Sequence, residues 1–173
     1  TLNLPDTEFS MKAGLPRKEP EILKFWSKTN VYEKIRKKYE GKELFLLHDG
    51  PPYANGAIHL GHSVNKVLKD ITVKSKTLQG YDAPFIPGWD CHGLPIELNV
   101  EKKHGKKSDL VKDKESFQKA CKEYAQSQIS DQLEDFKRLG VFGDWENSYM
   151  SLDLKFEADI IRSFGVIFDA GHI

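Results

Sequence analysis

The stretch LFLLHDGPPYANGAIHLGH, residues 44–62, carries the clearest structural pattern in the sequence. It begins with a short apolar run, continues into a loop rich in Gly and Pro, and ends where a helix is predicted to start. A continuous apolar run of this length is typical of a buried strand in a parallel sheet. The apolar residues that follow keep helical spacing: Val64, Val67, Leu68 and Ile71. They predict a helix with one apolar face that ends before Gly80.

The next segment repeats this order. Residues 83–86 are predicted to form a second short strand, and the loop PGWDCHGLPIE follows at residues 87–97. The end of this loop opens another predicted helix, with Pro95 near the first turn, where proline is tolerated. Two strand–loop–helix units in succession predict a right-handed βαβ unit and an α/β fold with a parallel sheet. The two loops are then expected to lie side by side, where open α/β sheets bind ligands.

The rest of the chain is predicted to be mostly helical. Pro and Gly punctuate residues 1–20, which are predicted to form an extended arm or loop. A helix is predicted from Glu21 until Gly41 stops it. Residues 101–115 are polar and charged, which favours a surface connection. Two further helices are predicted at residues 116–139 and 153–168, the second with Asp153 as its N-cap.

Composition excludes several classes of protein. The chain has 173 residues, and its Lys and Arg residues number 26, as do its Asp and Glu residues, so the net charge excludes a wholly basic nucleic-acid wrapper. Two cysteines without a CxxC pair exclude a disulfide framework and fit a reducing compartment. No apolar run approaches the ~20 residues of a membrane helix, and no signal sequence is visible. The chain starts at Thr1 rather than Met, which predicts a piece of a longer protein.

His59 and His62 are the first candidate site residues. Three residues apart at a helix start, they share one face, and Gly61 between them would let a flat ring lie against its backbone. A helix N-terminus offers free N–H groups, and imidazoles that donate or are protonated can add hydrogen bonds to an anion. Such a set can hold a polyphosphate and stabilise displacement at phosphorus. The alternatives are ordinary surface histidines, or zinc ligands for which no nearby Cys or Glu completes a set.

The second loop supplies Asp90 as a candidate counter-ion for an ammonium group. Its alternative role is a turn or N-cap aspartate. Trp89 either lines a pocket or belongs to the core. Cys91 lacks the partners of a nucleophilic cysteine, and His92 beside it has no assignable role. Cys121 falls on the apolar stripe of the long predicted helix and is expected to be a small buried residue.

Together these strings resemble a known family. HLGH at residues 59–62 resembles the HIGH signature of the class I aminoacyl-tRNA synthetases, with Leu60 at a position that allows apolar variation. DGPPYANG at residues 49–56 and GWDCHGLPIE at residues 88–97 are similar to the isoleucyl members in particular. The resemblance implies an N-terminal arm and helix over residues 1–42. It also implies the first half of a Rossmann-like catalytic domain, with a parallel nucleotide-binding sheet, over residues 43–173.

The resemblance also implies an activity and a set of site residues. The full-length protein would be a cytoplasmic monomer that activates isoleucine with ATP and Mg²⁺ and transfers it to tRNA(Ile). The phosphates of ATP would lie near His59 and His62, the implied catalytic residues, and the adenine near Gly61. The other implied ATP-binding residues are Asn55 and Gly56. The implied amino-acid-binding residues are Pro51, Pro52, Tyr53, Gly88, Trp89 and Asp90, with Asp90 holding the α-ammonium group. No zinc site is implied in this segment.

Other parts of the family's pattern are absent from these residues. The Lys-rich KMSKS signature, the editing domain and the anticodon-binding domain have no counterpart here, so the isolated chain is expected to turn over negligibly. Two other classes remain open. One is a small HxGH nucleotidyltransferase. The other is a non-catalytic nucleic-acid-binding module built on residues 101–123. This segment contains eight Lys and five acidic residues, although such a charged run is more often a solvated surface.

Overall fold

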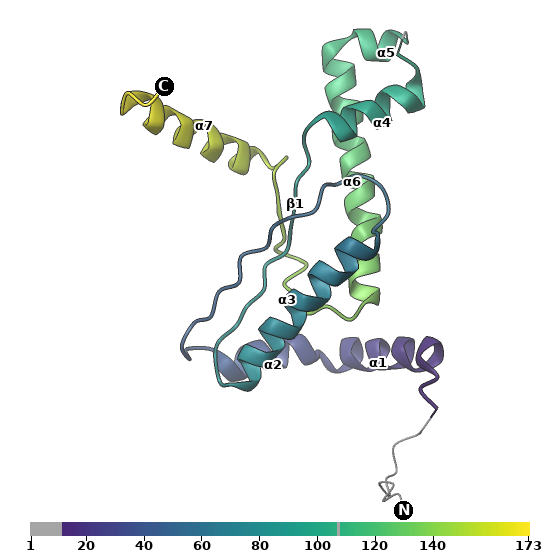
Figure 1. The fold of residues 1–173 in the computed structure, drawn as a ribbon, viewed down its shortest axis with the longest axis vertical. Coiled ribbons are helices and arrows are strands. Elements are labelled where there is room, and N and C mark those ends of the chain that lie inside the picture. The colour runs from purple at the N-terminus through teal and green to yellow at the C-terminus, as the bar shows by residue number, and fades with distance from the viewer. Residues whose placement is uncertain (1–11, 107) are drawn as a thin grey trace, which may run out of the picture.

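The computed structural model describes residues 12–106 and 108–173, which form a mainly helical fold with a small parallel sheet (Figure 1). The helices are α1 (Leu15–Thr29), α2 (Val31–Tyr39), α3 (Leu60–Leu78), α4 (Leu94–His104), α5 (Asp109–Lys112), α6 (Lys114–Arg138) and α7 (Leu154–Asp169). The strands are β1 (Gly88–Trp89) and β2 (Tyr149–Met150). They pair in parallel, with Gly88 opposite Tyr149 and Trp89 opposite Met150.

The centre of the molecule is extended chain rather than a regular sheet. The segments at residues 44–53 and 82–90 run parallel on either side of α3 in the sequence, and they bridge only near their two ends (Figure 1). The predicted parallel arrangement is therefore confirmed, but the continuous strands predicted at residues 44–48 and 83–86 are wrong. Prolines supply the reason, because four of them lie in these segments without an N–H for the ladder: Pro51, Pro52, Pro84 and Pro87.

The first apolar run is also not buried on both faces as predicted. Leu44 and Leu46 are 61% and 63% exposed, whereas Phe45 and Leu47 pack against a core cluster. Successive side chains of an extended chain point to opposite faces, so only one face of this segment is covered within the described residues.

The N-terminal region differs from the prediction. Residues 1–11 lie outside the described part of the chain, but α1 already begins at Leu15, within the predicted arm. Pro16 lies in its first turn, where the missing N–H has no helical partner to lose.

The single helix predicted from Glu21 is two helices. Asn30 takes the left-handed conformation, with φ at 51°, and separates α1 from α2. Asn tolerates this conformation better than most residues do. Trp26 of α1 packs edge-on against Phe142, with ring centroids 4.9 Å apart, and so attaches the pair to the body of the molecule.

The remaining predicted helices are confirmed with small changes. α4 begins at Leu94 with Pro95 in its first turn, and α6 and α7 match the predicted ranges closely. The predicted surface connection at residues 101–115 is wrong, because most of it belongs to α4, α5 and the start of α6. Asp153 is the N-cap residue of α7 as predicted, but its carboxylate accepts the Met150 N–H at 3.2 Å and makes no hydrogen bond to an N–H group of the helix.

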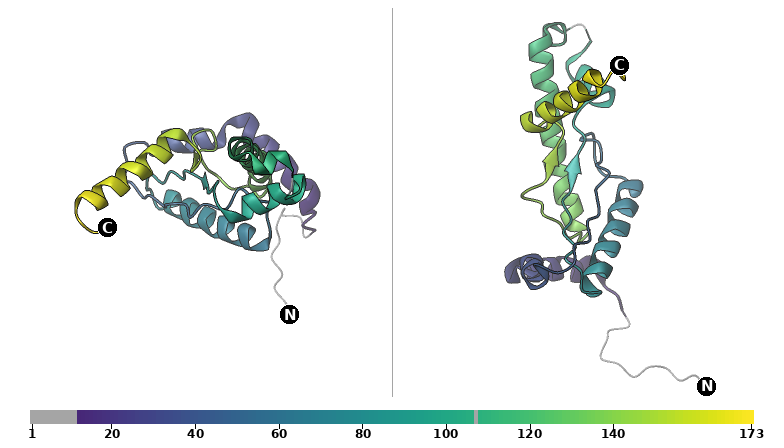
Figure 2. Two further views of the ribbon diagram at one scale, coloured as in Figure 1. Left: turned by 90° about the horizontal axis from the view of Figure 1, so that it is seen from above. Right: turned by 90° about the vertical axis from the view of Figure 1, so that its left-hand side faces the viewer.

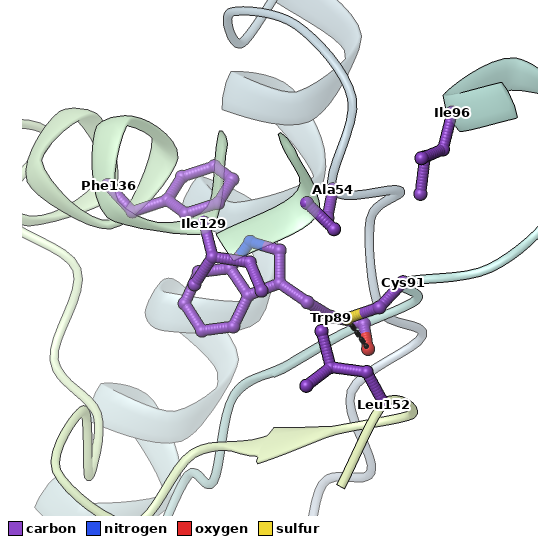
Figure 3. Close-up of a cluster of buried hydrophobic side chains, with 8 residues drawn as sticks. Ala54, Trp89, Cys91, Ile96, Ile129, Phe136 and Leu152 are labelled. Carbon is purple, nitrogen blue, oxygen red and sulfur yellow. Dashed lines mark hydrogen bonds between the residues drawn. The ribbon is translucent and has the colours of Figure 1, made fainter. Parts of the chain in front are cut away.

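Two apolar clusters form the core. The larger one joins both loops to α6 and to Leu152, two residues after β2. Most of its members are shown in Figure 3: Ala54, Trp89, Cys91, Ile96, Ala125, Ile129, Phe136 and Leu152. The smaller cluster packs under α3: Val73, Ala83, Phe85 and Val141. The loops that carry the candidate site residues are therefore backed by packed side chains.

Much apolar surface stays uncovered in this chain. Several large apolar side chains of α3 and α7 are more than half exposed: Leu60, Leu68, Ile71, Ile161, Val166 and Phe168. The predicted apolar face of α3 is exposed, and its buried residues are Lys66, Asp70, Val73 and Thr77. α7, which the structure describes in full, has no buried residue and extends away from the body (Figure 2). Within residues 12–106 and 108–173, no helix is both long and apolar enough to cross a membrane.

Candidate functional site

A cavity of about 340 Å³ opens beside the start of α3. It is lined by residues from both ends of the first loop and from two helices: Gly50, Pro51, Pro52, Tyr53, His59, Gly61, His62, Asn65, Lys66 and Phe136. The structure thus brings together a large part of the predicted site: Pro51, Pro52, Tyr53, His59, Gly61 and His62.

The two histidines cap α3 reciprocally. His59 is the N-cap residue, and its Nδ1 accepts the N–H groups of Gly61 and His62 at 3.1 and 3.4 Å. The Nδ1 of His62 accepts the His59 N–H at 3.3 Å, which completes a capping box. The rings stack with centroids 3.9 Å apart. The helix start is therefore organised by the same side chains that are predicted to meet phosphate.

This cap determines the tautomer of both neutral imidazole rings. Because each Nδ1 accepts a hydrogen bond, each neutral imidazole carries its proton on Nε2. Burial lowers the pKa of His62, and the nearby His59 and Lys66 lower it further. The free N–H groups predicted at this helix start are not free at Gly61 and His62, because His59 uses both. What the histidines offer a ligand is their Nε2–H groups.

Gly61 is required by the same arrangement. A Cβ at this position would lie 2.9 Å from His59 Cε1, closer than carbon atoms approach without displacement. A flat ring was predicted to lie against this glycine, and in the structure the imidazole of His59 lies there. A contact of Gly61 with adenine stays a prediction.

A buried cluster of charges lies beside the cavity. Asp49 is fully buried and pairs through one carboxylate oxygen with Lys66 and through the other with Lys69, the second at 2.6 Å. Burial lowers the pKa of the Lys66 ammonium, and the Asp49 carboxylate opposes that shift. Gly88 also donates its N–H to Asp49, at 3.2 Å. With both lysines charged, the group of two ammonium ions and one carboxylate has a net charge of about +1. Lys66 also lines the cavity, so this positive charge lies beside it.

Sequence reasoning missed these lysines. Lys66 is only 2% exposed, and its ammonium also lies 5.2 Å from the centroid of the Phe136 ring. Their spacing was the available signal. Residues 62, 66 and 69 are four and three positions apart, so they lie on one face of the predicted helix.

Asp90 is joined to the first loop through the backbone. Its N–H donates to Pro52 O, and its carbonyl accepts the Ala54 N–H, both at 2.8 Å. The predicted adjacency of the two loops is therefore confirmed. Asp90 Oδ1 accepts from Ser151 Oγ at 3.4 Å and from the His92 N–H at 3.5 Å. Among the described residues, Oδ2 has no hydrogen-bond donor and is available to an ammonium group.

Trp89 and Gly88 do not line the cavity. The Trp89 side chain is 1% exposed and belongs to the larger core cluster, so a direct contact of its ring with an amino acid stays a prediction (Figure 3). Gly88 lies directly under the Tyr149 ring, where a Cβ would be 2.2 Å from the nearest ring carbon. The structure thus uses both residues to pack the second loop against its neighbours.

Gln132 of α6 ties the two loops together from below. It is fully buried, and its side-chain amide donates to Tyr53 O at 3.0 Å and to Gly56 O at 2.8 Å. Its Oε1 accepts the Trp89 indole N–H at 3.0 Å. Sequence reasoning missed this residue because no local pattern marks a lone Gln on a helix far along the chain.

Asn55 is also held by helices. Its side-chain oxygen accepts from Asn99 Nδ2 at 2.7 Å and from the Tyr124 hydroxyl at 2.9 Å. Neither Asn55 nor Gly56 lines the cavity, and their contact with ATP stays a prediction.

The cysteines and acidic residues do not form a metal site in the part of the chain that is described. No group of three or more His, Cys, Asp or Glu side chains is placed there to hold a metal ion. Burial raises the pKa of both Cys91 and Cys121, so neither is an activated thiolate. Cys121 is half-buried against the larger core cluster.

Known proteins resemble this chain over its full length. The isoleucine–tRNA ligase of Hahella chejuensis is 61% identical over all 173 residues, and that of Francisella tularensis subsp. mediasiatica is 58% identical. The chain spans 18% of the length of each of these relatives. The chain also resembles a solved structure, the crystal structure of the ternary complex of Agrobacterium radiobacter K84 agnB2 LeuRS-tRNA-LeuAMS. The overlay covers 92% of this chain and 18% of that one, with a TM-score of 0.69 and 19% sequence identity.

The structural overlay supports the same overall fold for these residues. The sequence profile of the tRNA synthetases class I (I, L, M and V) matches residues 21–173. This range contains both loops, the capping histidines and Asp90. The chain therefore belongs to the class I tRNA synthetases.

Proposed function

We propose that the full-length protein containing this chain activates isoleucine with ATP, forming isoleucyl-adenylate, and then transfers isoleucine to tRNA(Ile). The observation that carries this proposal is the backbone pairing of Asp90 with Pro52 and Ala54. Pro52 lines the cavity together with His59, His62 and Lys66, whereas Asp90 does not line it and is joined to it through this backbone pairing. The names of the similar ligases support isoleucine as the substrate.

The triphosphate of ATP is proposed to bind beside the capping histidines. Displacement at phosphorus by the isoleucine carboxylate releases pyrophosphate and places growing negative charge on the phosphate oxygens. His59 and His62 donate from Nε2 without having to gain a proton first, and such donors bind more strongly as that charge grows. The excess positive charge of Lys66 and Lys69 favours the same anion. Mg²⁺ would arrive bound to the triphosphate.

The remaining contacts follow the geometry of the loops. The adenine is proposed to lie near Gly61, with Asn55 and Gly56 at the edge of its site. The isoleucine ammonium would bind Asp90 Oδ2. Pro51, Pro52 and Tyr53 would supply apolar wall, and Gly88 and Trp89 would hold the second loop in register.

Several coarser features complete the proposal. Residues 43–173 would be the first half of a Rossmann-like catalytic domain, and residues 1–42 an arm and helices attached to it. The full-length protein would act as a monomer in the cytoplasm. The isolated chain spans 18% of its relatives, and we expect it to turn over negligibly.

The test is ATP–pyrophosphate exchange by the full-length protein with each of the twenty amino acids. Isoleucine-dependent exchange is expected. Exchange that depends on another amino acid, with none for isoleucine, would overturn the proposal. Salt-sensitive RNA binding without any ATP binding would instead favour a nucleic-acid-binding module.

A further inference from the structure

Ser151, His92 and Glu157 form a chain of polar contacts behind Asp90. Ser151 Oγ lies 3.4 Å from Asp90 Oδ1 and 3.3 Å from His92 Nδ1. The other ring nitrogen, His92 Nε2, lies 3.3 Å from the Glu157 carboxylate. Ser151 follows β2 and its N–H donates to the Trp89 carbonyl at 3.1 Å, so the hydroxyl is held in place from its own backbone.

These contacts have fewer hydrogen-bond protons than acceptors. Ser151 Oγ already accepts the Cys91 N–H at 2.7 Å, and its single hydroxyl proton can go either to Asp90 or to His92. Glu157 is an acceptor, so the Nε2 that faces it carries a proton. When Nδ1 is protonated as well, it donates to Ser151 Oγ and leaves the hydroxyl proton for Asp90. When Nδ1 is bare, it competes with Asp90 for that proton.

The same contacts join the second loop to α7. Glu157 lies in the first turn of α7, which extends away from the body (Figures 1 and 2). Beside this pair, the Phe156 ring stacks on Tyr149 with centroids 5.9 Å apart. The ionisable residues that line the adjoining cavity of about 400 Å³ with His92 are Cys91, Glu97, Cys121, Lys122 and Glu157. Of these side chains, that of Glu157 bonds directly to the imidazole.

We infer that His92 is a positioning residue for the amino-acid site. As an imidazolium paired with Glu157, it donates from Nδ1 to Ser151 Oγ and leaves the hydroxyl proton for Asp90 Oδ1, which orients the carboxylate with Oδ2 turned to the substrate ammonium. This inference rests on the proposed function, because it concerns the carboxylate that is proposed to bind the amino acid. It gives His92 a role that its sequence context does not indicate, and it makes the position of α7 part of the amino-acid site.

The test compares KM for isoleucine with KM for ATP in the full-length protein, by ATP–pyrophosphate exchange. His92→Ala removes both contacts and is expected to raise KM for isoleucine about tenfold, the scale of one hydrogen bond to a charged group, with KM for ATP within about twofold of wild type. His92→Asn keeps an amide near the position of Nδ1 and is expected to recover most of the loss. Glu157→Gln keeps the length of the side chain without its charge, and an intermediate KM is expected.

A double-mutant cycle separates positioning from general damage. Ser151→Ala combined with His92→Ala is expected to cost less than the sum of the single changes, because the proposed effect of the His92 side chain on Asp90 passes through the Ser151 hydroxyl. Asp159→Asn is the matched control, since Asp159 lies on α7 but pairs with Arg162 of the same helix. It should leave both KM values unchanged.

The outcomes distinguish the two proposals. Wild-type protein without isoleucine-dependent exchange would overturn the proposed function. Wild-type exchange with additive effects in the cycle, no recovery in His92→Asn, or equal changes in the two KM values would overturn the positioning role alone.

Discussion

Replacing Gln132 by Leu removes the side chain that connects the two loops, with little change in volume. Three hydrogen bonds are lost, two to the carbonyls of Tyr53 and Gly56 and one from the Trp89 indole. We expect residues 53–56 to open more often as a result. A matched control is Gln128→Leu, one turn earlier on α6, where the side chain bonds, among the residues that the structure describes, only to the neighbouring Ser127.

The size of the effect follows from what each group loses. The Trp89 N–H is deeply buried, and a buried donor without an acceptor costs about 1–3 kcal/mol. The two carbonyls are partly accessible to water, so each net hydrogen bond contributes about 0.5–1.5 kcal/mol. The sum is about 2–6 kcal/mol, and its lower end corresponds to amide exchange about 30-fold faster.

Hydrogen–deuterium exchange of the full-length protein measures this locally. The reporters are the Ala54 and Asp90 amides, which are bonded between the loops. Gln132→Glu adds a test of sign, because a carboxylate would place an oxygen against two carbonyl oxygens. Burial would raise the pKa of that carboxyl, so the variant should lose stability as pH rises above about 4.3. Exchange at Ala54 and Asp90 no faster in Gln132→Leu than in Gln128→Leu would refute this reasoning.

Three further changes test the charges and the packing around the cavity. Asp49→Asn leaves the buried Lys66 ammonium without its counter-ion, at a cost of about 3–5 kcal/mol in local stability measured by exchange of α3 amides. Loss of the carboxylate lowers the pKa of Lys66 in the folded state further below 10.5, so the folded protein loses the Lys66 proton at a lower pH than the unfolded chain does. The loss of stability should therefore become smaller as pH rises, and a loss that grows with pH would contradict this. Gly88→Ala forces a Cβ against the Tyr149 ring, and overpacking of about 1–3 kcal/mol should appear as faster exchange of the Tyr149 amide, with unchanged exchange as the contrary result. Asp90→Asn should raise KM for isoleucine about 10- to 100-fold in ATP–pyrophosphate exchange with KM for ATP unchanged, whereas an equal rise in both would argue against an ammonium contact.

The helices were largely predictable because their signals are local. Periodic apolar residues gave α3 and α6, and Pro95 marked the first turn of α4. The break at Asn30 was missed, because a single left-handed residue has no periodic signature. The apolar stripe of α3 was found, but which face of α3 the chain covers depends on Asp49, and that contact is a tertiary one.

The extended segments were harder to predict. A buried strand and a one-sided extended segment have the same apolar run, and the difference at residues 44–48 depends on which neighbours cover Leu44 and Leu46. The prolines were visible in the sequence, and their missing N–H groups were the available evidence against a continuous ladder.

The candidate site was predictable only where its residues are close in sequence. The loops and their adjacency followed from the order of elements, and the histidines from their spacing. Reciprocal capping by Nδ1 is a matter of side-chain geometry, which spacing alone does not specify. Gln132 and Ser151 bond to residues between 43 and 79 positions away, and no local pattern reports such contacts.

The contacts of β2 also bear on synthesis at the ribosome. The Tyr149 hydroxyl bonds to the carbonyl of Asp49, 100 positions earlier, and Ser151 bonds to Asp90, 61 positions earlier. At about 5–20 residues per second, a nascent chain makes Asp90 about 3–12 s before Ser151. During that interval the first loop and α3 are already made but lack this support, so the first part of the site is synthesised several seconds before the residues that hold it in place.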